Sequence, residues 1–127
     1  MFRVLTVVSL LLLPAAAHAQ DAGAGEKVFA ACRACHQVGP TAKNLIGPEL
    51  NGLMGRKAGS VAGFNYSTAN KDSMVTWTEA EFTTYIRDPN ARMPGTKMIY
   101  PGLKDDQKIA DLIAFLKQYD AQGKKTP

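Results

Sequence analysis

The sequence predicts an all-α protein with one small domain and long loops, and three observations support this. The chain has 127 residues, about the length of one domain. Two segments, one toward each end, carry apolar residues at helical spacing, and no segment alternates apolar and polar residues as a half-buried strand does. A composition of 46% hydrophobic and 20% charged residues excludes a wholly disordered chain.

Residues 1–19 have the pattern of a cleaved secretory signal peptide. A basic start at Arg3 precedes the uncharged, mostly apolar segment 4–13, and Ala17-His18-Ala19 has the A-x-A form of a cleavage site. A retained membrane anchor is the alternative, but the apolar segment is much shorter than the roughly 20 residues of a membrane span. We therefore expect an exported protein, a periplasmic one in a bacterium, whose domain comprises residues 20–127.

Cleavage changes the charge of the chain only slightly. The formal charge falls from +4 to +3, and His36 is then the one remaining histidine. A net positive charge this small does not favour a nucleic-acid partner, and the sequence has no basic stripe with interleaved aromatic residues.

A first helix is predicted over Gly23–Cys35. Val28, Phe29 and Cys32 share one face of it. Gly25 lies one turn before Phe29, where the missing side chain permits another helix to approach closely.

Residues 37–75 are rich in Gly and Pro and predict a long loop with one short helix near Ser67–Lys71. A loop of this length is unusual in a small domain. It is reasonable if the loop wraps a large apolar object that replaces ordinary side-chain core.

Thr78–Glu81 is a capping box and predicts the start of another helix. This helix should end near Asp88, because a residue before a proline such as Pro89 is disfavoured in the α region. Its expected inward residues are Phe82, Tyr85 and Ile86.

The last helix has the clearest pattern. Asp105 and Asp106 favour its first turn, Lys117 its last turn, and Gly123 is expected to stop it. The final residues 123–127 are expected to fray. The apolar stripe consists of Ile109, Leu112, Ile113, Leu116 and Tyr119.

Cys32-Arg33-Ala34-Cys35-His36 is a C-x-x-C-H motif, which is typical of c-type haem attachment. Residues three apart on a helical turn project on the same side, so both thiols can bond the two vinyl groups of one porphyrin. His36 then lies under the ring and can ligate the iron.

Three alternatives for the motif are weaker. A structural zinc site needs four ligands, and no second Cys/His cluster is present. A thioredoxin-like motif needs a βαβ setting. A plain Cys32–Cys35 disulfide leaves the long loop without a core.

The second axial ligand of such an iron is expected to be a methionine, which is neutral and soft. Met98 lies in a Pro- and Gly-containing segment far along the chain, and Met93 is an alternative to it. Met54 and Met74 are interpreted as core filler.

These motifs occur together in one known family, and the chain resembles class I cytochrome c, in particular the soluble bacterial carriers close to mitochondrial cytochrome c. The resemblance runs from about Gly25 to Gln118. It implies a small single-domain class I cytochrome c fold, with three to five helices and long loops wrapped around one covalently bound haem c. The motifs are Cys32–His36, Gly47–Leu53, Gly55–Lys57, Gly63–Tyr66, Ala69–Lys71, Trp77, Pro94–Met98 and Asp111–Leu116.

The resemblance also implies roles for individual residues. Met98 is then the sulfur ligand, the Pro48 carbonyl accepts from His36, and the Tyr85 hydroxyl approaches the Met98 sulfur. Gly25 and Phe29 are expected to pack against Leu112 and Phe115 where the terminal helices cross. A buried haem propionate would be held by Arg56, Tyr66 and Trp77, with Asn70 nearby.

The implied function is one-electron transfer by a protein that is not an enzyme. With both axial positions filled by His36 and Met98, substrate has no place on the iron. The family implies a monomer without stable membrane insertion, carrying electrons from a quinol–cytochrome c reductase to a terminal oxidase or a photosynthetic reaction centre. A haem enzyme or gas sensor, the competing class, needs one open axial position.

Docking to such membrane complexes is expected to be transient and electrostatic. The chain departs from the mitochondrial pattern at several basic positions, where it has Ala31, Asn90-Ala91 and Asp105-Asp106 instead of lysines. The docking face is therefore expected to carry fewer basic residues than that of mitochondrial cytochrome c. Its candidate residues are Lys27, Lys43, Arg92, Lys97 and Lys104, with Arg33 as a further one.

Overall fold

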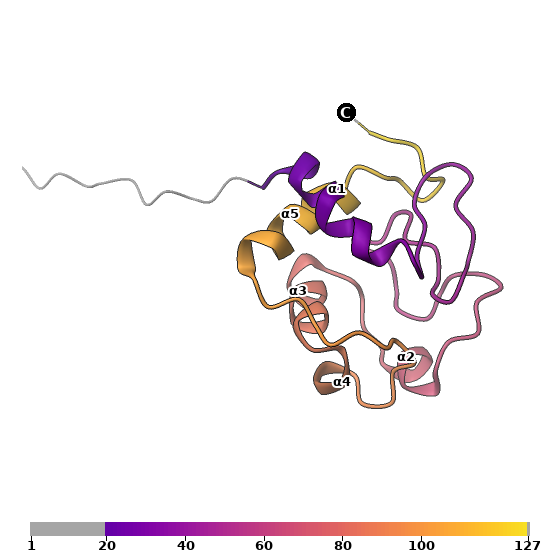
Figure 1. Cartoon of the computed structure of the whole chain (residues 1–127). Helices are drawn as coiled ribbons and strands as arrows, with labels where there is room; N and C mark the ends of the chain where they lie inside the picture. The colour runs from indigo at the N-terminus through magenta and orange to yellow at the C-terminus, as the bar shows by residue number, and fades with distance from the viewer. Residues whose placement is uncertain (1–19, 127) are drawn as a thin grey trace, which may run out of the picture.

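The computed structural model describes residues 20–126, in which helices are joined by long loops (Figure 1). Within this range the backbone forms no strand and only two isolated bridges, so the predicted all-α class is confirmed. The predicted signal peptide lies outside the described residues. The elements are α1 (Ala22–Phe29), the 3₁₀ turn η1 (Ala30–Cys32), α2 (Thr68–Asp72), α3 (Glu79–Arg87), α4 (Pro89–Arg92) and α5 (Asp106–Leu116).

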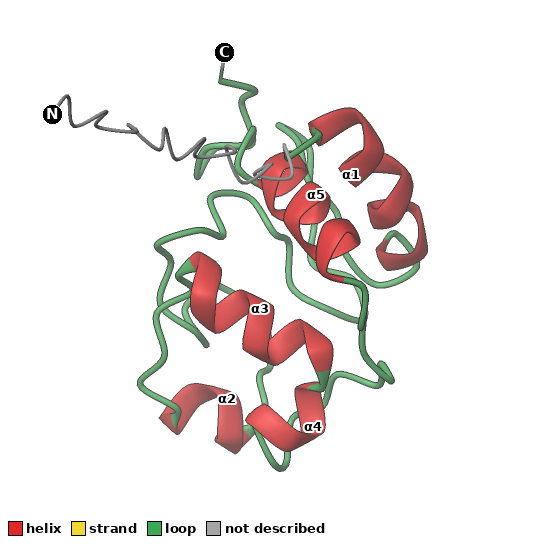
Figure 2. Cartoon of the chain, turned by 90° about the vertical axis from the view of Figure 1, so that its left-hand side faces the viewer, coloured by secondary structure: helices red, strands yellow, loops and turns green. Residues whose placement is uncertain are grey.

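The terminal helices α1 and α5 lie side by side and cross at Gly25 (Figures 1 and 2). A Cβ atom on Gly25 would meet the backbone carbonyl of Asp111 and would lie 2.8 Å from the Cβ of Phe115. The rings of Phe29 and Phe115 pack 5.1 Å apart between their centroids. The missing side chain therefore sets how closely the two helices approach, as predicted.

A buried carboxylate also stabilises the crossing of α1 and α5. Asp111 on α5 accepts the backbone N–H of Asp21 at 3.0 Å and the side-chain amide of Gln107 at 2.9 Å. Asp21 in turn caps α1 by accepting the N–H groups of Gly23 and Ala24. Because Asp21 both caps α1 and donates its N–H to the buried carboxylate of Asp111, the start of α1 is tied to α5.

The first helix is shorter than predicted. The α-helix ends at Phe29 instead of Cys35, and the 3₁₀ turn Ala30–Cys32 follows. The Cys32 carbonyl accepts N–H groups from both Cys35 and His36, at 3.1 and 2.9 Å. This tight turn bends the chain instead of continuing the helix, and it places the motif at the end of α1.

The last helix is also shorter than predicted, and residues 123–126 of the expected frayed tail pair with the rest of the chain. The helix ends at Leu116, seven residues before the expected stop at Gly123. Gly123 has a φ of 77° and packs against the backbone carbonyl of Gly39. The N–H of Thr126 donates to the carbonyl of Gln118 at 2.7 Å. The tail folds back on the chain because its backbone groups pair there.

The middle helices begin at side-chain caps. Ser67 accepts the N–H of Asn70 at 3.0 Å, so α2 lies where the sequence predicts a short helix. Thr78 accepts the N–H of Glu81 at 3.1 Å and starts α3. The Glu81 side chain does not complete the capping box but bonds the guanidinium of Arg92 at 2.9 and 3.0 Å.

Pro89 ends α3, as expected, and also starts α4, which the sequence did not predict. Asp88 accepts the N–H of Ala91, and Pro89 occupies the first helical turn, where its missing N–H costs nothing. The four-residue helix ends at Arg92 and leads into the segment that carries Met98.

The long loop is ordered by backbone hydrogen bonds to distant parts of the chain. The N–H of Gly52 donates to Tyr119 at 3.1 Å, and the N–H of Ala58 donates to Val75 at 2.8 Å. These bonds hold the loop around the interior without forming a sheet. No helix among the described residues has the length and apolar character needed to cross a membrane.

Substitution of Gly25 tests the helix crossing. We expect Gly25→Leu to lower the free energy of unfolding by about 3 kcal/mol, because the side chain would collide with the α5 backbone. Gly23→Ala is the matched control on the same helix, and it should change stability by less than about 1 kcal/mol. Urea unfolding of both variants measures the difference; equal effects would contradict the packing role of Gly25.

Met74 does not fill the core as the sequence interpretation expected. Its side chain is 79% exposed, and its backbone has a φ of 60°, in the left-handed region. An L residue costs roughly 1–2 kcal/mol in this conformation, whereas glycine adopts it without a steric penalty.

We expect Met74→Gly to raise the free energy of unfolding by about 1 kcal/mol, because the strain at this position is relieved and little packing is lost. Lys71→Gly, an exposed position inside α2, should instead lower it by about 1 kcal/mol. Thermal unfolding of the two variants measures both changes, and destabilisation by Met74→Gly would refute the strain.

Candidate cofactor site

A largely enclosed cavity of about 260 Å³ lies between the terminal helices, α3 and the segment that carries Met98. Side chains from α1, α2, α3 and α5 line it together with residues of the long loop. The lining combines many apolar side chains with a few polar ones, as cofactor sites commonly do. All the predicted cofactor-facing residues line it: Cys32, Cys35, His36, Pro48, Arg56, Tyr66, Asn70, Trp77, Tyr85 and Met98.

The two cysteines lie at one end of this cavity. In the described chain both are free thiols and both are half-buried. Burial raises the pKa of the Cys32 thiol, and the neighbouring Cys35 raises it further. The 3₁₀ turn and the residues after it therefore present two free thiols, three residues apart, to one cavity.

The imidazole of His36 is held in one orientation. Its Nδ1 lies 2.7 Å from the carbonyl oxygen of Pro48. A carbonyl can only accept, so Nδ1 carries the proton and Nε2 keeps its lone pair. Burial lowers the pKa of His36, the bond to Pro48 opposes this, and the charge of Arg56 lowers it further. The ring is therefore a neutral ligand with a fixed tautomer.

Gly47 makes room for this ring. A Cβ atom there would lie 2.7 Å from Nδ1 and 2.8 Å from Nε2 of His36. Any side chain at this position would displace the imidazole. The Gly47-Pro48 pair therefore supplies both the space and the hydrogen-bond acceptor.

Met98 approaches from a different part of the chain. The Tyr85 hydroxyl lies 3.4 Å from its sulfur and 2.9 Å from the hydroxyl of Thr96. The N–H of Met98 donates to the same Thr96 oxygen at 3.3 Å. Burial raises the pKa of Tyr85, and the bond to Thr96 opposes this. The thioether is thus placed by α3 and by its own loop.

The other methionines do not line this cavity. Met93 is 4% exposed and belongs to the apolar core. Met54 packs against the core and faces a separate outer cavity. Met74 points to solvent. Of the candidates that the sequence offered as a sulfur ligand, the structure brings Met98 to the cavity.

Polar groups without protein partners lie at another part of the cavity wall. Among the described residues, the buried side-chain atoms without a hydrogen bond are Nε of Arg56 and Oδ1 of Asn70. Both residues line the cavity. Because buried polar groups are nearly always paired, these atoms indicate a polar group of a bound molecule.

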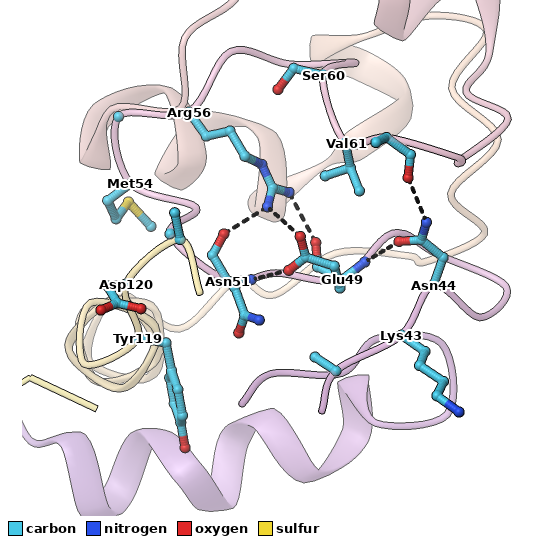
Figure 3. Close-up of a pocket in the computed structure, with 15 residues that line it drawn as sticks. Lys43, Asn44, Glu49, Asn51, Met54, Arg56, Ser60, Val61, Tyr119 and Asp120 are labelled. Atoms are coloured by element: carbon cyan, nitrogen blue, oxygen red, sulfur yellow. Dashed lines mark hydrogen bonds and ion pairs between the residues drawn. The ribbon is translucent and has the colours of Figure 1, made fainter. Parts of the chain in front are cut away.

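Arg56 is held by the loop on its other side (Figure 3). Its terminal nitrogens donate to the backbone carbonyls of Asn51 at 2.8 Å and Glu49 at 3.1 Å. Tyr66 lies in the same wall and accepts the N–H of Val61 at 3.1 Å. Burial chiefly raises the pKa of the Tyr66 phenol. The Trp77 ring packs edge-on against Tyr85, 4.9 Å between centroids.

These residues fit haem. The cavity supplies apolar walls for a porphyrin, two thiols for its vinyl groups, and imidazole and thioether ligands for iron. The unpaired Nε–H of Arg56 is a donor and fits a carboxylate substituent, whereas Oδ1 of Asn70 accepts and fits a donor group.

The structure separates the predicted docking residues into two groups. Arg92 is paired with Glu81, and Lys104 donates to the carbonyl of Arg87, so both contribute to structure. Lys97 lies beside the cavity and donates to the carbonyl of Asn65 at 3.2 Å.

The remaining basic candidates lie on the surface. Lys27 and Lys43 are exposed, and Lys43 borders the outer cavity. Arg33 is exposed, 3.7 Å from Glu26, with its guanidinium 5.0 Å from the centre of the Phe29 ring.

The sequence interpretation missed two apolar residues that line the cavity. Ile46 is 80% exposed and Ile99 is fully exposed, and both line the cavity. They therefore lie where it meets solvent. No periodic pattern could have found them, and their positions next to Gly47 and Met98 are the one signal that the sequence offers.

Comparisons with known proteins agree with this site. The family model described as "Cytochrome c" matches residues 22–120. Cytochrome c2 of Blastochloris viridis is 57% identical over 121 residues, which cover 95% of this chain and 94% of that protein. Cytochrome c-550 of Nitrobacter winogradskyi is 53% identical over 104 residues, 82% of this chain and 95% of that protein.

A solved structure shares the fold. Cytochrome cH from Methylobacterium extorquens superposes with a TM-score of 0.73 at 46% identity, over 77% of this chain and 98% of that one. The family model, the relatives and the solved structure agree on one family. The chain therefore belongs to the cytochrome c family, as a class I bacterial cytochrome c that carries one covalently attached haem c and transfers electrons rather than acting as an enzyme.

Proposed function

We propose that residues 1–19 are a cleaved signal peptide and that the domain 20–127 is a periplasmic one-electron carrier with His36 and Met98 as its axial ligands. It accepts electrons from a quinol–cytochrome c reductase and delivers them to a terminal oxidase or a photosynthetic reaction centre. The observation that carries the proposal is the convergence of two thiols, one imidazole and one thioether on a single cavity.

Bound haem supplies a one-electron Fe(III)/Fe(II) couple. Cys32 and Cys35 hold it by thioether bonds. His36 offers the lone pair of Nε2, because Nδ1 is committed to the Pro48 carbonyl at 2.7 Å. Met98 offers a neutral sulfur, which favours the ferrous state and raises the potential. Two protein ligands leave no open position, which supports electron transfer over ligand activation.

The polar wall holds the carboxylate substituents. Arg56 has an unpaired Nε–H to donate to a carboxylate, and Asn70 lines the same cavity. Tyr66 and Trp77 stand in the same wall and exclude water from these charges. Such buried, preoriented groups change little between two redox states, which favours rapid electron exchange.

Docking uses the solvent-exposed edge of the cavity. Ile46 and Ile99 supply an apolar contact, and Lys97 a charge beside them. Lys27 and Lys43 add exposed positive charge to the surface, whereas Arg92 is largely neutralised by Glu81. A contact of this kind is transient and sensitive to salt.

Replacement of the sulfur ligand tests the axial assignment. In Met98→Ala the weak near-infrared band of methionine-bound ferric haem should disappear, and the reduction potential should fall by on the order of 0.2 V, within the range that axial ligands command. Absorption spectra and redox titration of the purified protein measure both.

Met93→Leu is the matched control, because Met93 fills the core instead of the cavity. It should keep the band and the potential. Loss of the band in Met93→Leu with its retention in Met98→Ala would reverse the assignment. A wild-type protein that is high-spin and binds carbon monoxide would instead indicate a haem enzyme or gas sensor.

The docking surface is tested by single charge removal. Lys27→Gln should slow electron transfer with a solubilised quinol–cytochrome c reductase severalfold at low salt, and the difference should vanish at high ionic strength. Lys124→Gln, on the C-terminal turn, should have a smaller effect. Stopped-flow rates over a range of salt concentrations measure this, and identical rates for the two variants would exclude Lys27 from the docking surface.

A further inference from the structure

Arg56 separates two cavities. It lines both the cofactor cavity and an open outer cavity, and Figure 3 shows the outer one. Glu49 and Asp120 line the outer cavity and not the inner one. The charge that Arg56 presents to the cofactor therefore depends on what faces it from the outer side.

Glu49 is the carboxylate that faces it. Its Oε1 lies 3.8 Å from a terminal nitrogen of Arg56, and its Oε2 accepts the N–H of Asn51 at 2.6 Å. The backbone N–H of Glu49 donates to Oδ1 of Asn44 at 2.9 Å. Both its main chain and its carboxylate are therefore fixed. Since the backbone carbonyl of Glu49 also accepts from Arg56 at 3.1 Å, one residue orients the guanidinium and opposes its charge.

The pair is shielded from solvent more than a surface pair is. The side chains of Arg56 and Glu49 are 16% and 21% exposed, so water and salt screen their charges only in part. Burial lowers the pKa of Arg56, and the charge of Glu49 opposes this. The carboxylate of Glu49 thus lowers the free-energy cost of burying the guanidinium of Arg56.

The charges of Arg56 and Glu49 determine the direction in which each shifts the reduction potential. Reduction adds one electron on the inner side of Arg56, and a nearby positive charge favours that step. A carboxylate beside the cation reduces this advantage. Among the described residues the ion pair of Arg56 is with Glu49 and not with Asp120, whose oxygen accepts the N–H groups of Gln122 and Lys124 in its own turn.

We propose that Glu49 is a positioning residue that lowers the reduction potential of the bound haem by orienting Arg56 and neutralising its charge at the wall between the two cavities. The proposal rests on the proposed function in that it places Arg56 beside the cofactor. It adds a residue outside the cofactor cavity to those that set the potential.

Redox titration of holoprotein tests it in the wild type, Glu49→Gln, Glu49→Asp and Asp120→Asn. Glu49→Gln should shift the equilibrium with a reference couple about threefold or more toward the reduced protein, because one partly screened negative charge is removed. Glu49→Asp, which keeps the charge, should stay near the wild type. Asp120→Asn removes the same charge from the same outer cavity and should shift the equilibrium by less than half as much.

A second measurement does not involve electron transfer. The charge of Glu49 raises the pKa of the Tyr66 phenol. Ultraviolet titration of the phenolate should therefore give a lower Tyr66 pKa in Glu49→Gln than in wild type, with no such change in Asp120→Asn. Because loss of burial would also lower this pKa, the comparison uses only variants that unfold at the wild-type temperature.

Equal shifts in Glu49→Gln and Asp120→Asn, or a shift toward the oxidised protein in Glu49→Gln, would overturn the proposal. If Glu49→Gln does not incorporate haem, Glu49→Asn is judged by the same criterion. The near-infrared methionine band of the wild type is recorded in parallel. Its absence would refute the proposed axial ligands, whereas its presence with an unchanged potential in Glu49→Gln would refute the role of Glu49 alone.

Discussion

The central apolar cavity is the feature on which the rest of this structure depends. Four of the helices contribute to its lining, yet their lengths are small and the loops between them are long. A chain of this size buries only part of its surface on folding, so a large apolar cofactor replaces side-chain core that the sequence lacks. The close crossing of α1 and α5 at Gly25 then positions the thiol-bearing turn against that cavity.

Polar groups on opposite sides of the cavity have different functions. The Pro48 carbonyl and the Tyr85 hydroxyl contact the two side chains proposed as iron ligands, His36 and Met98, and each fixes an orientation. Arg56 has its terminal nitrogens fixed by the loop and leaves one N–H free for the cofactor. The site is therefore preorganised: the groups that bind the cofactor are held by groups that do not touch it.

The basic residues of the molecule fall into those that are paired within the protein and those that remain exposed. Several basic residues that the sequence offered for docking are used within the protein, as the pairing of Arg92 with Glu81 shows. The surface near the cavity edge combines exposed apolar side chains, Ile46 and Ile99, with Lys97. Sequence position alone could not separate these groups, because a charge is free or paired according to what lies opposite it in space.

The sequence by itself determined the class of fold, the haem motif and the positions where α2 and α3 begin, since these depend on residues close together in the chain. It overestimated the lengths of α1 and α5, and it placed Met74 in the core and the end of the last helix at Gly123. These predictions were wrong because helix ends and burial depend on distant contacts such as that of Gly123 with Gly39. The residues alone left both Met98 and Met93 as candidates for the sulfur ligand. Only tertiary structure brought Met98 to the cavity, beside Tyr85, and buried Met93 in the core, because both outcomes depend on residues from other elements.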